Sequence, residues 1–200
     1  EEPSSLYFAD AARLEAFDFL TKKERERLLD KDLQAEKKCL SACEKADIQI
    51  LTLGDAAYPA RLKSIYDPPV VLYLQGRMPE IDEEAAIAVV GTRDASAYGL
   101  RQAERLAYEM TKQGALVVSG LARGIDSAAA RGALRAGGRV VGVLGCAIDR
   151  VYPAENRALF QDVAACGCLL SEYGPGTPTD RGNFPARNRI MSGLSLATLV

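Results

Sequence analysis

The stretch from Arg181 to Arg189 combines residue types that bind nucleic acid. It holds three arginines, two asparagines and Phe184, and no acidic residue falls within it. Guanidinium groups form paired hydrogen bonds with phosphate, and an aromatic ring can stack on a nucleobase. This pattern is typical of surfaces that bind single strands. We expect the stretch to be a loop. In the alternative interpretation, Phe184 anchors that loop in the core and the arginines are solvated.

Two glycine-bearing turns offer a second kind of chemistry. Gly91, Thr92 and Arg93 follow one apolar run, and the segment 119–124, which starts with Ser119 and Gly120, follows another. Free backbone N–H groups and the positive end of a helix dipole favour an anion where such a turn leads into a helix. We therefore predict a phosphate or sulfate near Ser119 and Gly120, or near Thr92 and Arg93. The alternative for Arg93 is an ion pair with a carboxylate such as Asp126.

These residues must be positioned by alternating strands and helices. Apolar runs at 86–90, 116–118, 139–144 and 168–172 predict strands, and helices are expected from residue 98 on, at 127–136 and at 154–165. Four such repeats indicate an α/β fold with a parallel sheet covered on both faces. The ligand crevice of such a sheet lies beyond the carboxyl ends of its strands, so Arg93, Arg123 and the 181–189 stretch can converge on one groove.

The ends of the chain carry further expectations. Residues 5–46 predict three short helices, with Thr21 and Glu24 forming a capping box. We place a small helical domain at 1–46 and the main domain at 47–200, with additional strands at 47–53 and 70–74 and a short helix at 60–65. The helical domain could bind a partner or merely cap the main domain. Residues 197–200 look like the start of a fifth main strand, so we expect the chain to be incomplete.

Several function classes are excluded or disfavoured by composition. The chain has no histidine, which removes Ser-His-Asp triads, Cys-His pairs and histidine-bound zinc. Neither a Gly-x-Gly-x-x-Gly fingerprint nor a P-loop follows any predicted strand, which disfavours dinucleotide and nucleoside-triphosphate sites. We expect no cofactor and no metal. The five cysteines form no pair of CxxC motifs and are expected to be inert thiols, and without a membrane span or signal peptide we expect a cytoplasmic location.

The charge distribution is uneven along the chain. The net charge is −2, but residues 85–200 carry 13 basic and 9 acidic residues, and 12 of those bases are arginine. Arginine suits phosphate better than lysine because its planar fork binds two oxygens at once. The alternative explanation for this bias is compositional drift.

Together these motifs resemble the DNA-processing protein A family, also called DprA or Smf. The likeness covers about residues 47–200 and rests on seven groups of residues: Val89 to Arg93 with Tyr98-Gly99, Val118 to Asp126, Val143 to Cys146, Tyr152-Pro153 with Glu155-Asn156, Ser171 to Tyr173, Pro175 to Thr177, and Asn183 to Pro185 with Arg187 to Ile190 and Gly193 to Ser195. The N-terminal helices resemble, more weakly, the sterile-alpha-motif-like domain of many members.

The resemblance implies an extended Rossmann-like, mostly parallel sheet with helices on both faces, preceded by a small all-α domain. It implies a protein that binds single-stranded DNA, has no established catalytic activity, protects incoming DNA during natural transformation and loads the RecA recombinase. Members act as homodimers, and no membrane is involved. The DNA-binding residues carried over are Thr92, Arg93, Ser119, Gly120, Arg123, Arg181, Asn183, Phe184, Arg187, Asn188 and Arg189.

Two departures and one competing function accompany this resemblance. Ala130 stands where the family usually has histidine, from which we expect only a packing change. The family's dimer contacts and RecA-interacting surface lie largely beyond Val200, so we expect this chain to bind DNA without necessarily dimerising or loading RecA. The competing function is a Rossmann-like nucleotide-binding protein or phosphoribohydrolase, for which Glu172 is the only nearby candidate carboxylate.

Overall fold

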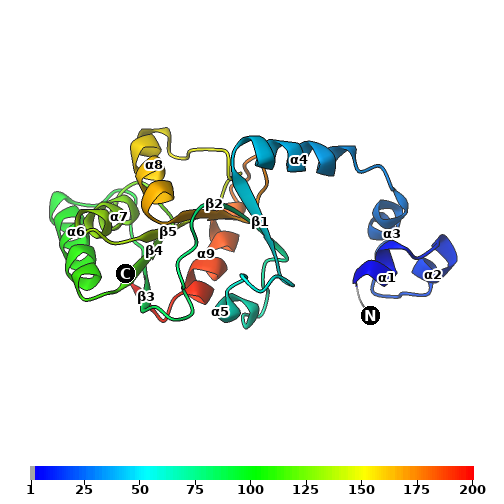
Figure 1. The fold of residues 1–200 in the computed structure, drawn as a ribbon, viewed down its shortest axis with the longest axis horizontal. Coiled ribbons are helices and arrows are strands. Elements are labelled where there is room, and N and C mark those ends of the chain that lie inside the picture. The colour runs from blue at the N-terminus through cyan, green and yellow to red at the C-terminus, as the bar shows by residue number, and fades with distance from the viewer. Residues whose placement is uncertain (1–2) are drawn as a thin grey trace. The chain divides into compact units, whose positions relative to one another are not determined.

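A computed structural model describes residues 3–200, and the chain divides into two compact units at the junction between Leu40 and Ser41. The first unit contains α1 (Pro3–Tyr7), α2 (Ala11–Glu15), α3 (Lys22–Leu29) and the start of α4 (Gln34–Lys45), as Figure 1 shows. The first of the three predicted helices is therefore two helices. The chain is interrupted before α2 because the Asp10 side chain accepts a hydrogen bond from the Arg13 amide at 2.8 Å and caps α2.

The predicted capping box of α3 is confirmed. The Glu24 amide donates to Thr21 Oγ1 at 3.3 Å, and the Thr21 amide donates to Glu24 Oε2 at 2.7 Å. Leu14 is fully buried, whereas Phe8 and Phe19 are exposed. The likeness of these helices to a sterile-alpha-motif domain stays a prediction.

The second unit is built on one sheet, which in the described residues has the strand order β1-β2-β6-β5-β4-β3-β7. The strands are β1 (Ile48–Thr52), β2 (Val71–Gly76), β3 (Ala86–Val89), β4 (Leu116–Ser119), β5 (Val140–Leu144), β6 (Cys168–Ser171) and β7 (Ala197–Leu199). The pairs β1–β2 and β2–β6 are antiparallel, and the other four pairs are parallel. The predicted α/β, mostly parallel fold is confirmed, and β7 is the predicted fifth main strand.

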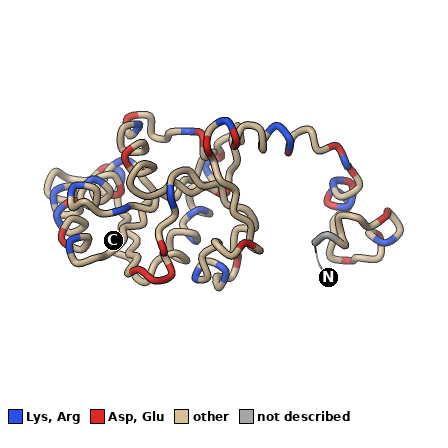
Figure 2. Tube along the Cα trace, in the orientation of Figure 1, with Lys and Arg blue, Asp and Glu red and all other residues tan. Residues whose placement is uncertain are grey.

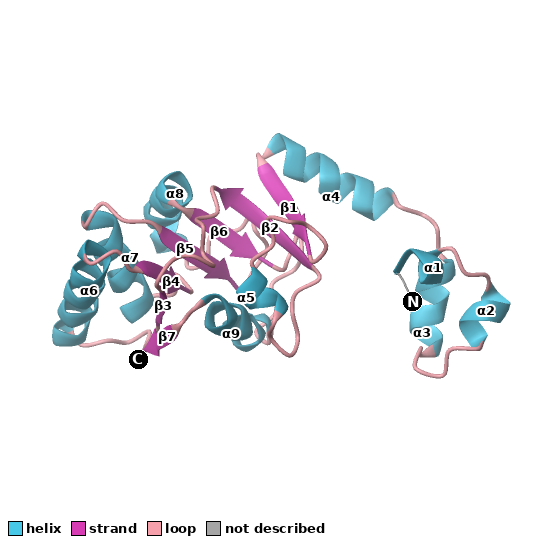
Figure 3. Cartoon of the chain, turned by 60° about the horizontal axis from the view of Figure 1, so that its bottom comes forward, coloured by secondary structure: helices cyan, strands magenta, loops and turns pink. Residues whose placement is uncertain are grey.

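Handedness explains where the helices lie. Strands β3, β4, β5 and β6 follow one another across the sheet, so right-handed crossovers place α6 (Ala97–Lys112), α7 (Ile125–Arg135) and α8 (Arg157–Cys166) on one face. A 3₁₀ turn (Ala154–Asn156) precedes α8. The return from β6 to β7 runs the opposite way, which puts α9 (Asn183–Leu194) on the other face beside α5 (Ala60–Lys63), as Figure 3 shows. Because both faces are covered, every residue of β4, β5 and β6 is buried.

The 181–189 stretch is not the predicted loop, because α9 begins at Asn183. Pro185 misleads sequence analysis here. It lies in the first helical turn, where backbone N–H groups have no partner within the helix, so the missing N–H of proline costs nothing. Phe184 is consequently held on a helix that packs against the sheet.

None of the described helices, from residue 3 to residue 200, is both long and apolar enough to cross a membrane.

Candidate functional site

Two adjoining cavities lie at the carboxyl edge of the parallel strands, and we call them together the central groove. Their volumes are about 380 and 340 Å³, and both are lined by Arg93, Ala122, Phe184 and Arg187. Arg93 follows β3, Ala122 follows β4, and the other two residues belong to α9. The convergence expected from sequence is therefore present for Arg93, Arg123 and the start of α9, since Arg123 lines the smaller cavity.

A cation and an aromatic ring meet at the centre of this groove. The Arg93 guanidinium lies 5.8 Å from the ring centroid of Phe184, within the range of a cation–π contact. The half-buried Phe184 ring also packs against Tyr152, with 5.3 Å between ring centroids. Its other neighbour is Gly145, where an added Cβ would approach Phe184 Cδ1 to 2.7 Å. Phe184 thus combines the two sequence interpretations, because the ring is anchored and yet lines the groove.

Arg187 forms the floor of the groove and is buried, with 5% of its surface exposed. Its Nη1 atom donates to the carbonyl oxygens of Val143 and Gly120, the latter at 3.2 Å. Burial lowers the pKa of Arg187, and the nearby Asp126 opposes that shift. These hydrogen bonds join α9 to the ends of β4 and β5. A DNA contact by Arg187 stays a prediction.

Asp126 occupies one of the two places where the sequence predicts an outside anion, the one at Gly120. Its two carboxylate oxygens accept hydrogen bonds from the amides of Gly91, at 3.3 Å, and Gly120, at 3.1 Å. Asp126 is 5% exposed, so burial raises the pKa of its carboxyl group, and the charge of Arg187 counteracts that rise. One buried carboxylate thus ties both glycine turns together, and the Gly120 amide does not face solvent.

The turn that carries Arg93 is fixed by close backbone contacts. The Ile125 amide donates to the Thr92 carbonyl at 3.2 Å, which joins this turn to the start of α7. Gly124 has a φ of +87°, and a Cβ there would come within 2.2 Å of the same carbonyl oxygen. Because the two turns cross so closely here, only glycine fits at position 124. The Arg93 backbone is therefore rigidly placed, while its side chain is exposed and makes no ion pair with a carboxylate among residues 3–200.

Some of the remaining predicted site residues are engaged by other groups of the protein, and others are exposed. Ser119 is fully buried, and its hydroxyl donates to the Asp126 carbonyl at 3.3 Å. Arg123 pairs with Asp94 at the surface. Arg189 is held by Glu172 through two bonds of 2.9 and 2.6 Å and by Asp67 at 3.0 Å. The hydrogen bonds to Glu172 raise the pKa of Arg189. Thr92 and Arg181 are exposed, Asn183 is half-buried, and Asn188 is exposed at the edge of the larger cavity.

Sequence reasoning missed two groove residues. Tyr152 is 50% exposed and lines the smaller cavity together with Glu155. An aromatic residue in the turn after a buried strand is the signal that could have identified Tyr152. The importance of Asp126 could not be recognised in the same way, because its partners come from two turns far apart in the sequence.

No group of three metal-binding side chains is found in the part of the chain that the structure describes. Burial raises the pKa of the Cys168 thiol to about 12, which suits an inert thiol.

The sequence profile of the family described as DNA recombination-mediator protein A matches residues 49–200. Protein Smf from Synechocystis sp. is 46% identical over 155 residues, which cover 76% of this chain and 39% of that protein. The chain thus spans less than half the length of this relative.

Two solved structures are similar to the chain. DNA processing protein A from Helicobacter pylori, described for its single-stranded DNA binding mode, superposes with a TM-score of 0.67 at 34% identity and covers 75% of this chain and 67% of its own. DprA from Streptococcus pneumoniae gives a TM-score of 0.72 at 29% identity and covers 97% of this chain and 71% of its own.

Proposed function

The chain belongs to the DNA recombination-mediator protein A family, and we propose that it binds single-stranded DNA in the central groove. The observation that carries this proposal is the exposed Arg93 guanidinium beside the Phe184 ring. One group can bind a phosphate while the other stacks on the attached base, and neither contact depends on base identity. The H. pylori relative, named for its single-stranded DNA binding mode, supports the same substrate.

The rigid surroundings of the pair favour binding. Asp126 and Gly124 hold the turn of Arg93, while Gly145 and Tyr152 hold the ring of Phe184. Groups already in place lose little conformational freedom when the ligand arrives. The helix that lines the groove, α9, packs against the sheet, which disfavours its entry into a major groove, so single strands are the expected partner rather than duplexes.

We further propose that the whole protein passes the bound strand to RecA, as in natural transformation, and that it works in the cytoplasm as a homodimer. Family membership is the support for these roles. Because the chain spans less than half of its Smf relative, the surfaces for RecA and for dimerisation can lie outside it.

We propose that the chain is not an enzyme. In the competing phosphoribohydrolase function, Glu172 would act on a nucleotide. Its carboxylate is engaged by two hydrogen bonds from Arg189, which disfavours a role as a proton acceptor. Incubation of the same sample with nucleoside monophosphates tests this point, and measurable release of the base would contradict the proposal.

Fluorescence anisotropy with a labelled oligothymidylate tests DNA binding directly. We expect tighter binding to the single strand than to a duplex of the same length, and affinity that falls steeply as salt rises, because bound cations are released from the phosphates. A preference for the duplex would overturn the proposal.

A further inference from the structure

A third cavity of about 450 Å³ adjoins the central groove on the side of α7. It shares Arg93, Arg123 and Glu155 with the smaller cavity of the groove. Beyond them it is lined by residues of α6, α7 and the turn before α8, among them Ser127, Arg131 and Asn156. The hollow surface therefore continues from Phe184 past Arg123 to Arg131, a residue that the predicted site did not include.

Arg131 is held at this cavity, and no neighbouring carboxylate neutralises its positive charge. Its side chain is exposed, and no carboxylate among residues 3–200 forms an ion pair with it. Its Nη2 atom lies 3.4 Å from Asn156 Oδ1. Asn156 is itself buried and fixed, because its amide nitrogen donates to the Leu121 carbonyl at 3.0 Å and to Ser127 Oγ at 2.8 Å. A neutral, fixed acceptor thus orients the guanidinium while its positive charge stays available.

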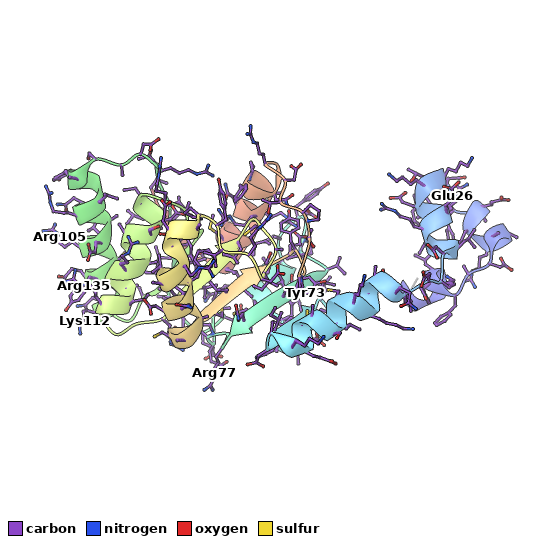
Figure 4. All side chains as sticks on the ribbon, turned by 90° about the horizontal axis from the view of Figure 1, so that it is seen from above. Glu26, Tyr73, Arg77, Arg105, Lys112 and Arg135 are labelled. Atoms are coloured by element: carbon purple, nitrogen blue, oxygen red, sulfur yellow. The ribbon has the colours of Figure 1, made fainter. Side chains whose placement is uncertain are left out.

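The next arginine on the same helix differs in both respects. Arg135, one turn later, forms an ion pair with Glu104 and lies outside the third cavity. Figure 4 shows Arg135 with Arg105 and Lys112 at the outer side of α6 and α7, and Figure 2 shows that these helices carry both basic and acidic residues. Arg135 therefore provides a matched control for Arg131.

Two acidic groups also line the third cavity. Asp94 is paired with Arg123, which neutralises it. Glu155 is exposed, and its carboxylate makes no ion pair with a basic group in the described part of the chain. It stands between the two cavities, so it would repel a phosphate backbone that passes there.

We propose that the third cavity is a second subsite for the same single strand, in which Arg131 binds a phosphate of a nucleotide outside the central groove. This inference rests on the proposed function, because the strand reaches Arg131 only after it has entered the groove. Glu155 limits the affinity of the combined site.

A series of oligothymidylates tests the proposal, with lengths from about 4 to about 16 nucleotides, the range of site sizes of folds that bind single strands. For the longest strands, Arg131→Ala should weaken binding about three- to tenfold and reduce the slope of log K against log salt by about 0.7, the loss of one phosphate contact. The shortest strands should bind the variant and the wild type alike. Arg131→Lys should retain most of the salt slope.

Two further variants make the outcome decisive. Arg135→Ala should bind every length as the wild type does. Glu155→Gln should bind long strands more tightly, an effect that misfolding cannot produce. If Arg131→Ala and the wild type bind long strands equally while Phe184→Ala is weakened, the second subsite is wrong and the groove stands. If the wild type binds no oligothymidylate, the proposed function itself fails.

Discussion

At the scale of single residues, the proposed DNA contacts divide into a charge contact by Arg93 and a stacking contact by Phe184. Arg93 is exposed on a fixed turn, and Phe184 is a half-buried ring whose neighbours hold it in place. Because each of the two side chains also has supports of its own, removing either one leaves the other partly in position. Their contributions can nevertheless be told apart by the salt dependence of binding.

For Arg93→Ala we expect a loss of roughly 1.5–3 kcal/mol in the free energy of DNA binding, the strength of a hydrogen bond to a charged group. The salt slope should become shallower by about 0.7 because one phosphate contact is lost. Titration by anisotropy at several salt concentrations measures both quantities. Arg101→Ala, which removes an exposed arginine outside the groove, is the control. An unchanged slope for Arg93→Ala would mean that this arginine contacts no phosphate.

For Phe184→Ala we expect a loss of roughly 1–3 kcal/mol from one stacked base, with a nearly unchanged salt slope. Thermal unfolding must be measured in parallel, since the ring also packs on Gly145 and Tyr152. A variant that melts several degrees lower yet binds DNA at wild-type strength would assign Phe184 to the core alone.

At the scale of elements, the crossing of two turns decides whether the site forms. The turn after β3 and the start of α7 touch at Gly124, and Asp126 bonds the turns after β3 and β4 together. Arg93 is thus placed by α7 as much as by its own strand.

Substitution at Gly124 tests this placement. Gly124→Ala puts a Cβ 2.2 Å from the Thr92 carbonyl, so the turn must move, and we expect both lower stability and much weaker DNA binding. Gly137→Ala provides a matched control. Gly137 has a similarly positive φ of +78° at the other end of α7, with no atom within 4 Å of an added Cβ. Gly137→Ala should lower the free energy of unfolding by about 1 kcal/mol and leave DNA binding unchanged. Equal binding by both variants would contradict the role of the crossing.

The sequence predicts some of these elements better than others. The run 116–118 and most of the run 139–144 are apolar, because β4 and β5 are buried on both faces, and the sequence predicts both strands. The sequence predicts a loop at the start of α9, because Gly182 and Pro185 are loop residues in most contexts. In the structure Gly182 is the N-cap of α9 and Pro185 lies in its first turn, where proline is tolerated. For the site, the pattern predicted Arg93 and Phe184 but not the burial of Arg187. The sequence alone does not distinguish an arginine that is buried beneath a groove from one that is exposed on the surface.

At the scale of the whole molecule, two buried side chains, Tyr58 and Cys168, make the stability of the second unit decrease at alkaline pH. Burial raises the pKa of Tyr58 from 10.0 to about 12, and that of Cys168 from 9.0 to about 12. The Tyr58 hydroxyl donates to the Pro69 carbonyl at 2.7 Å, and Cys168 lies in β6. Between pH 9 and 12 the unfolded chain releases these protons while the folded chain keeps them, so the free energy of unfolding decreases as pH rises.

We therefore expect the wild type to lose roughly 2–4 kcal/mol of unfolding free energy per buried group as pH rises through this window. Denaturant titrations at a series of pH values measure this loss. Tyr58→Phe should be less stable by about 1 kcal/mol at neutral pH, because the Pro69 carbonyl loses its donor, yet its stability should fall less steeply above pH 10. Tyr66→Phe, at an exposed position, is the control. Parallel curves for Tyr58→Phe and the wild type would contradict this assignment.

The position of the Asp126 carboxylate affects how well free nucleotides and phosphate can compete with a strand for the groove. Cells contain high concentrations of free nucleotides and inorganic phosphate, and a strong pocket for one phosphate would be occupied by them. Here an internal carboxylate already fills the place between the two turn amides. What remains for an outside ligand is a row of separate, individually weak contacts. A polymer engages several of them at once and gains from their high local concentration, whereas a monomer engages only one. We therefore expect the protein to favour a strand over free nucleotides without contacts that read base identity.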